Sequence, residues 1–320
     1  MGGSIEPSTL IKYKSGLNKF NVFLGQSGVV FPLPSCSSSS ELRSLISQSG
    51  VIEAFICFCF KGDLTRRTTE SYIDALRYFA TDLGGIPFFP GEAIIARLLS
   101  GYQKLGKRPS PLKCGIDVLL LRRLVTHVDH MNLKADKALW KAMFIIAFFG
   151  CFRVSEFLVS KDELKLLSFN RVRLVGDSIE FILKKSKNNS SGQAQQILFA
   201  PLPGDLACPV QALRAFISVR CSSKSSAAFF IDSKGVPIIA SRFTLVLRKA
   251  LSGLGILEPL SYSSKSFRVG AASMCYSMNM SNEDIQALGR WASLAFLYYV
   301  RSGARAIRAR DVQKKLASVL

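Results

Sequence analysis

Three separated segments of the sequence carry arginines of the kind that bind phosphate groups. The segments span residues 149–156, 265–272 and 288–293, and their arginines are Arg153, Arg268 and Arg290. Arginine suits a phosphate because its planar guanidinium group donates paired hydrogen bonds and does not lose its proton in proteins. These residues therefore offer a clamp for a charged phosphoryl group.

A pair of tyrosines follows the third segment. Tyr298 and Tyr299 stand just before Val300-Arg301. A tyrosine hydroxyl can attack phosphorus and hold the phosphate covalently. Cutting a phosphodiester in this way also needs cations on the non-bridging oxygens and an acid for the departing sugar oxygen. A polar loop between the first two segments supplies three lysines that could act as the acid: Lys184, Lys185 and Lys187.

The elements that must position these residues fall into two predicted domains. Apolar residues at three- and four-residue steps predict helices throughout residues 1–104, the fourth of them over Glu92–Tyr102. Two prolines, a glycine and three positive charges between 104 and 112 interrupt that pattern and indicate a linker over 105–112. We therefore expect a helical domain over 1–104 and a second domain over 113–320.

The second domain is predicted to be mainly helical with one small antiparallel sheet. Helices are expected at about 113–131, 136–149, 209–219 and 241–254, and Ser281 is expected to cap a helix that Gly289 closes. Between residues 169 and 200 the apolar period changes to two, and Gly176-Asp177 marks a turn. The fold class is thus mainly α with a small antiparallel β-sheet that carries a long basic loop.

The charge balance narrows the choice of partner. The chain has 320 residues with 42 Lys and Arg against 22 Asp and Glu, a net charge of +20. A folded protein this basic is typical of partners that are polyanions, nucleic acid first and an anionic membrane surface second. The longest apolar runs, 51–60 and 142–152, are much shorter than the roughly 20 residues of a membrane-spanning helix.

Taken in order, with a basic hairpin between the first two, these motifs resemble the tyrosine recombinases of the phage-integrase superfamily. The likeness is strongest to those of eukaryotic DIRS-type and Crypton-type mobile elements, and it covers nearly the whole chain. It implies a helical core-binding (SAM-like) domain, a linker and a catalytic domain. It also implies that the chain cuts and rejoins DNA through a 3′-phosphotyrosyl intermediate, with neither a metal nor ATP as cofactor.

The resemblance assigns a role to each matching position. Arg153 and Arg268 would clamp the scissile phosphate, and Glu156 would support the site from behind. Lys187, which matches the family best through Ser186-Lys187, would protonate the leaving 5′ oxygen. Tyr299 would be the nucleophile and Tyr298 its competitor, since valine or isoleucine follows the family's tyrosine.

Two positions depart from the family pattern. Lys265 stands three residues before Arg268, where histidine is usual. Lysine can bind phosphate and donate a proton, but its ordinary pKa makes it a poorer base. Near Gly289 the family usually has histidine or tryptophan. Residue type points to Trp291, and spacing to the tyrosine points to Arg290; either side chain could donate a hydrogen bond to the phosphate. Further contacts to DNA are expected from Arg66, Arg67, Lys107, Arg108, Lys184 and Lys185.

The resemblance also implies the partners: double-stranded DNA held in a C-shaped clamp, and further copies of the chain in a tetramer on paired sites. No small-molecule ligand or membrane is expected, and the place of action is intracellular, in the nucleus if the source is eukaryotic. Three alternatives remain. They are a catalytically impaired DNA-binding derivative, a type IB topoisomerase-like enzyme, and a basic RNA- or membrane-surface protein.

Overall fold

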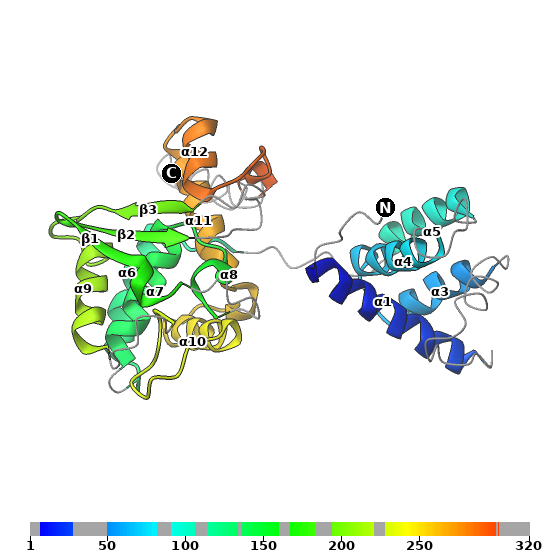
Figure 1. Ribbon diagram of the computed structural model, residues 1–320, viewed down its shortest axis with the longest axis horizontal. Coiled ribbons are helices and arrows are strands. Elements are labelled where there is room, and N and C mark those ends of the chain that lie inside the picture. Colours follow the sequence, from blue (N-terminus) through cyan, green and yellow to red (C-terminus); the bar gives the residue numbers. More distant parts are fainter. Residues whose placement is uncertain are drawn as a thin grey trace, which may run out of the picture. The chain divides into compact units, whose positions relative to one another are not determined.

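The chain folds into two compact units, residues 1–110 and 111–320. The computed structural model describes them over residues 7–27, 50–81, 91–105, 114–133, 136–159, 167–183, 194–220, 228–298 and 300. Figure 1 shows helices in both units and the described strands in the second. The predicted linker, 105–112, lies outside these residues except for Leu105.

Unit 1 is a helical bundle in its described part. Its helices are α1 (Pro7–Gln26), α3 (Val51–Lys61), α4 (Arg66–Thr81) and α5 (Glu92–Leu105). Their apolar stripes meet in one core, where the rings of Phe20 and Phe55 pack edge to face with centroids 5.0 Å apart. Thr65 caps α4 because its Oγ1 accepts a hydrogen bond from the Thr68 amide at 3.2 Å.

Unit 2 surrounds a buried central helix. Its longer helices are α6 (Val118–Val128), α7 (Lys137–Phe149), α9 (Pro209–Val219), α10 (Ala240–Gly253), α11 (Lys265–Ser277) and α12 (Asn282–Gly289). Every residue of α7 from Ala142 to Phe148 is buried, as expected of a helix enclosed on all sides. Helices α6, α9 and α11 pack against it (Figure 1). A short helix, α8 (Val154–Phe157), follows α7.

The described strands form one antiparallel sheet in the order β1 (Val172–Val175), β2 (Ser178–Leu183), β3 (Gln195–Phe199). Gly176, with φ 58°, allows the tight turn between β1 and β2. In β2 buried and half-buried residues alternate, and Phe181 pairs with Val172 on one side and Ile197 on the other. The predicted small sheet is confirmed, while the loop with Lys184, Lys185 and Lys187 lies outside the described residues.

Some helix limits differ from the sequence predictions. The helix expected over 113–131 is shorter, because Asp117 caps it by accepting a hydrogen bond from the Leu120 amide at 2.7 Å. The segment before this cap instead pairs with α11, where the Ile116 amide donates to the Ser266 carbonyl at 2.9 Å. No helix in the described ranges combines the length and apolar character needed to cross a membrane.

Candidate active site

A sharp turn between α7 and α8 presents Arg153. Gly150 ends α7, and Cys151 adopts a left-handed conformation with φ 44° before the chain enters α8. A Cβ on Gly150 would lie 2.3 Å from the ring of Phe152, so glycine is required for this ring to fold back under the turn. Arg153 is the residue that precedes α8, and its side chain is 21% exposed.

Glu156 fixes this turn from inside. Its Oε2 accepts a hydrogen bond from the Arg153 amide at 2.8 Å, and its Oε1 accepts one from Arg153 Nη1 at 2.9 Å. The carboxylate therefore caps α8 and holds the guanidinium group of the residue that starts the helix. The Glu156 side chain is only 2% exposed, which places this ion pair at the inner edge of the site.

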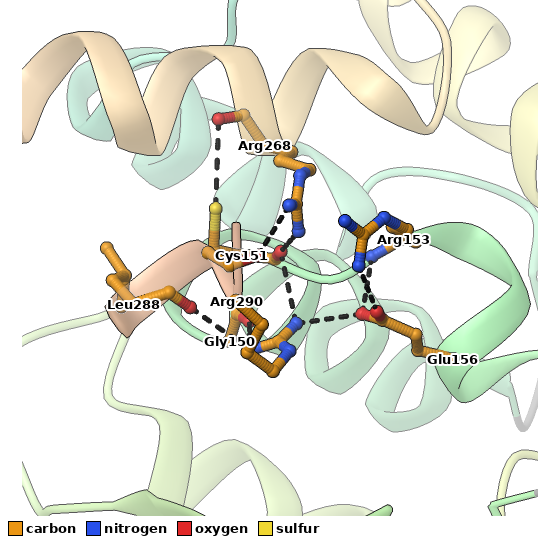
Figure 2. Close-up of polar contacts among 8 residues, drawn as sticks. Gly150, Cys151, Arg153, Glu156, Arg268, Leu288 and Arg290 are labelled. Atoms are coloured by element: carbon orange, nitrogen blue, oxygen red, sulfur yellow. Dashed lines mark hydrogen bonds and ion pairs between the residues drawn. The ribbon is translucent and has the colours of Figure 1, made fainter. Parts of the chain in front are cut away.

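Arg290, which lies 134 positions after Glu156 in the chain, contacts the same carboxylate. It ends α12 in a left-handed conformation with φ 55°, and its Nη2 donates to Glu156 Oε2 at 2.8 Å. Figure 2 shows Glu156 between Arg153 and Arg290, with contacts to both. Burial would raise the pKa of Glu156, but the charges and hydrogen bonds of Arg290 and Arg153 outweigh it and hold that pKa below its ordinary value.

Arg268 lies on α11 and is 3% exposed. Its Nη1 donates to the Cys151 carbonyl at 2.5 Å, and its Nη2 donates to the Gly289 carbonyl. The Trp291 ring lies below the guanidinium group, 4.0 Å from ring centroid to Cζ. Burial, with repulsion from neighbouring arginines, lowers the pKa of Arg268 to about 10, so the group stays charged at neutral pH.

These contacts gather an excess of positive charge. Three guanidinium groups (Arg153, Arg268, Arg290) meet one carboxylate (Glu156), a formal charge of 3 − 1 = +2. The thiol of Cys151 adds no negative charge, because burial raises its pKa to about 11. A partly buried cluster of this sign favours an anion, and guanidinium groups suit phosphate oxygens in particular.

The structure explains the end of α12 differently from the sequence. Gly289 was predicted to close the helix, and it is the last residue of α12, but the left-handed residue that follows it is Arg290. A Cβ on Gly289 would lie 1.7 Å from Cζ3 of Trp291, so the glycine is needed to let this ring reach Arg268. The predicted helix end is therefore confirmed, while the packing of the Trp291 ring against Gly289 is a contact that the helix pattern does not reveal.

The remaining predicted residues are only partly described. Lys265 is exposed and is the first residue of α11, one helical turn before Arg268. Tyr298 is 80% exposed, whereas its neighbours Phe296 and Val300 are buried. Arg66 pairs with Glu70 at 2.7 Å at the start of α4, where Arg67 is exposed. Outside the described residues lie Tyr299, Lys184, Lys185, Lys187, Lys107 and Arg108.

Sequence reasoning missed the pairing of Glu156 with Arg290. It expected Glu156 to support the site without naming its partner, and it considered Arg290 as a hydrogen-bond donor to the phosphate. The two residues are 134 positions apart, and nothing local to either segment indicates that they meet. A usable signal was charge balance, because a single carboxylate among several arginines attracts more than one of them.

The Glu156 pair predicts how stability depends on pH. Glu156→Gln is expected to lower the free energy of unfolding by about 3 kcal/mol at neutral pH, since it leaves buried arginines without their carboxylate. Because the folded-state pKa is lowered, the difference from wild type is full above the ordinary value of 4.5 and disappears as the pH falls through the lower folded value. Denaturant unfolding measured at several pH values checks this.

The control is the exposed Glu258, where Glu258→Gln should change stability by less than about 0.5 kcal/mol at each pH. A Glu156→Gln deficit that stays constant down to strongly acidic pH would contradict the ion-pair account.

Comparison with solved structures identifies the fold. No protein-family model matches the sequence, and no curated protein matches it. The Tn1549 transposon integrase in complex with transposon right end DNA aligns at TM-score 0.60 and 13% identity, covering 98% of this chain and 95% of that one. A lambda integrase dimer bound to a core site aligns at TM-score 0.58 and 12% identity, covering 93% and 72%.

A third structure, the XerH site-specific recombinase bound to its difH substrate, aligns at TM-score 0.53 and 13% identity, covering 88% of this chain and 72% of that one. At these identities the alignments describe the arrangement of the backbone. They agree with the mainly helical architecture and its small antiparallel sheet. The chain therefore has the fold of the tyrosine recombinases and integrases.

Proposed function

We propose that this protein is a DNA strand-transferring enzyme, a tyrosine recombinase that cuts and rejoins duplex DNA. The observation that carries the proposal is the cluster of Arg153, Arg268 and Glu156, which brings distant segments together with a net positive charge. The net charge of +20 and a fold shared with recombinases and integrases bound to DNA support the same conclusion.

In the proposed reaction Tyr299 is the nucleophile. Its phenolic oxygen loses its proton to solvent and attacks the scissile phosphorus, the bond from phosphorus to the 5′ oxygen breaks, and a 3′-phosphotyrosyl link forms. Arg153 and Arg268 bind the non-bridging oxygens, where negative charge grows in the transition state. Lys187 gives its proton to the leaving 5′ oxygen, and Lys265 is placed to contact the phosphate. The 5′ hydroxyl of a second strand then reverses these steps, so the bond energy is retained throughout.

A covalent adduct tests this proposal. The protein is incubated with duplex oligonucleotides of randomised sequence, each nicked so that the short cleaved fragment diffuses away. Wild type should form a DNA adduct that survives denaturation, and Tyr299→Phe should form none because it lacks the attacking oxygen. Tyr298→Phe is the matched control and should keep the adduct. An adduct lost in Tyr298→Phe and kept in Tyr299→Phe would reverse the assignment.

A second candidate function is DNA binding without cleavage. Lys265 supports it, since an exposed lysine stands where the family has histidine and would be a poor base. This candidate predicts strong, salt-dependent binding of duplex DNA with no adduct in any variant. Restored cleavage in Lys265→His would identify the chain as an impaired recombinase.

The biological setting is part of the proposal. The likeness to a transposon integrase supports a role in the movement of a mobile element, and the sequence motifs favour DIRS-type or Crypton-type elements. We propose that four copies act together on paired DNA sites, and that they do so in the nucleus if the host is eukaryotic. Crosslinking of the protein with and without duplex DNA would test the oligomer.

A further inference from the structure

We propose that Arg290 is a positioning residue: it holds Arg153 in place through Glu156 and makes no contact with the scissile phosphate. This inference rests on the proposed recombinase function and refines it. By spacing to the tyrosine, Arg290 occupies the position expected to donate a hydrogen bond to DNA. Its contacts point instead into the protein.

The first argument is that the guanidinium group of Arg290 already has partners within the protein. Its Nη1 donates to the carbonyls of Gly150 at 2.9 Å and Leu288 at 3.1 Å. Its Nη2 donates to Glu156 Oε2 at 2.8 Å and to the Cys151 carbonyl at 3.3 Å. Its Cζ lies 5.1 Å from the centroid of the Phe152 ring. To reach a phosphate, it would have to break several of these bonds.

The backbone of Arg290 directs the side chain inward. Its left-handed conformation, φ 55°, ends α12, and its side chain contacts the carbonyls of the α7–α8 turn. Non-glycine residues adopt this conformation at an energetic cost, which the contacts to Glu156 and the turn carbonyls offset. A residue held in this way by partners on another segment is suited to fixing that segment.

The second argument is that Glu156 connects Arg290 to Arg153. Oε2 of Glu156 is shared by Arg290 Nη2 and the Arg153 amide, and Oε1 binds Arg153 Nη1. Arg153 itself is more exposed than Arg290, with 21% of its side chain accessible. Without Arg290, the Glu156 carboxylate loses the charge that holds it on its inner side. Arg153 would then lose its fixed direction toward the phosphate.

A double-mutant cycle separates positioning from direct contact. Adduct formation at saturating DNA is measured in Arg290→Met, Arg153→Ala and the double variant. Arg290→Met is expected to slow the adduct by about 100-fold, because a small displacement of a catalytic group has this effect. The double variant should then be no slower than Arg153→Ala, within about twofold, since Arg290 acts through Arg153. Losses that multiply would overturn the proposal, because they indicate independent action on the phosphate.

A second variant covers the case in which Arg290→Met does not fold. Arg290→Lys keeps a charge but lacks the fork that binds Glu156 and three carbonyls together, so it should lose about 10-fold in rate with unchanged DNA affinity. A folded Arg290→Lys variant that forms the adduct as fast as wild type would contradict the positioning role of Arg290. Arg214→Lys, an exposed arginine on α9, is the matched control and should behave as wild type.

One readout does not depend on cleavage. The ionisation of the Glu156 carboxyl is followed by carbon NMR in wild type and in Arg290→Lys. The substitution should raise the pH at which the carboxyl titrates, and an unchanged titration would overturn the link between Arg290 and Glu156. If wild type forms no adduct, the recombinase proposal fails, while the titration still decides whether Arg290 controls Glu156.

Discussion

Arg268→Lys is expected to slow formation of the covalent adduct by about 10³-fold while duplex DNA still binds. The Arg268 guanidinium donates to the carbonyls of Cys151 and Gly289 and lies over the Trp291 ring. Lysine has a point charge and no planar fork, so it cannot keep these contacts and also present paired donors to a phosphate. Single-turnover cleavage and equilibrium binding, measured on the same nicked duplexes, separate the two effects.

The control for Arg268→Lys is Arg214→Lys, which makes the same chemical change at an exposed site on α9. Cleavage by Arg214→Lys should stay within about twofold of wild type. If Arg268→Lys cleaves as fast as this control, Arg268 is not part of a phosphate clamp, and the proposed mechanism loses one of its two arginines. If binding and cleavage fall together, Arg268 serves DNA affinity and not the transition state.

Gly270→Ala is expected to destabilise unit 2 by roughly 3 kcal/mol. Gly270 lies on α11, where a Cβ would be 1.7 Å from the carbonyl oxygen of Ile116. That oxygen belongs to backbone held against α11 by the bond from the Ile116 amide to Ser266, so it cannot swing away as a side-chain end could. The added Cβ must therefore push α11 and the Ile116 backbone apart. Denaturant unfolding of the full chain measures the loss.

A matched glycine on a helix of unit 1 should respond in the opposite direction. A Cβ on Gly101 of α5 meets nothing within 4 Å, so Gly101→Ala should stabilise unit 1 by about 0.5–1 kcal/mol. Equal and small effects at both positions would show that backbone contact at Gly270 does not limit the packing of α11. Because α11 also bears Arg268, Gly270→Ala is expected to impair cleavage as well.

Local signals predicted the elements of this fold well. The helix Pro209–Val219 agrees with its predicted limits because apolar spacing and a proline at its start are written in adjacent residues. Ser281 caps α12 as expected, accepting a hydrogen bond from the Asp284 amide at 3.1 Å. The alternation at Ile179, Phe181 and Leu183 likewise located β2. Each of these features depends on neighbours only a few positions away.

The site was harder to predict where it depends on distant residues. The residue types of Arg153 and Arg268 indicated a clamp, and the structure brings both to the Cys151 turn. The inward direction of Arg290 depends on Glu156 and on the left-handed end of α12, neither of which a linear pattern reveals. A linear pattern also does not reveal why position 289 must be glycine, which is that the Trp291 ring occupies the space of a Cβ there.

The hydrogen bonds at the Cys151 turn also set an order of events during protein synthesis. Arg268 binds Cys151 across 117 positions, and Arg290 binds Gly150 across 140. Chains leave the ribosome from the amino end, and contacts this distant form late in folding. The contacts that fix the turn before Arg153 and Glu156 therefore form only after much of unit 2 has been translated. A nascent chain that stops before residue 290 contains Arg153 and Arg268 but lacks the contact from Arg290 to Glu156 that fixes Arg153.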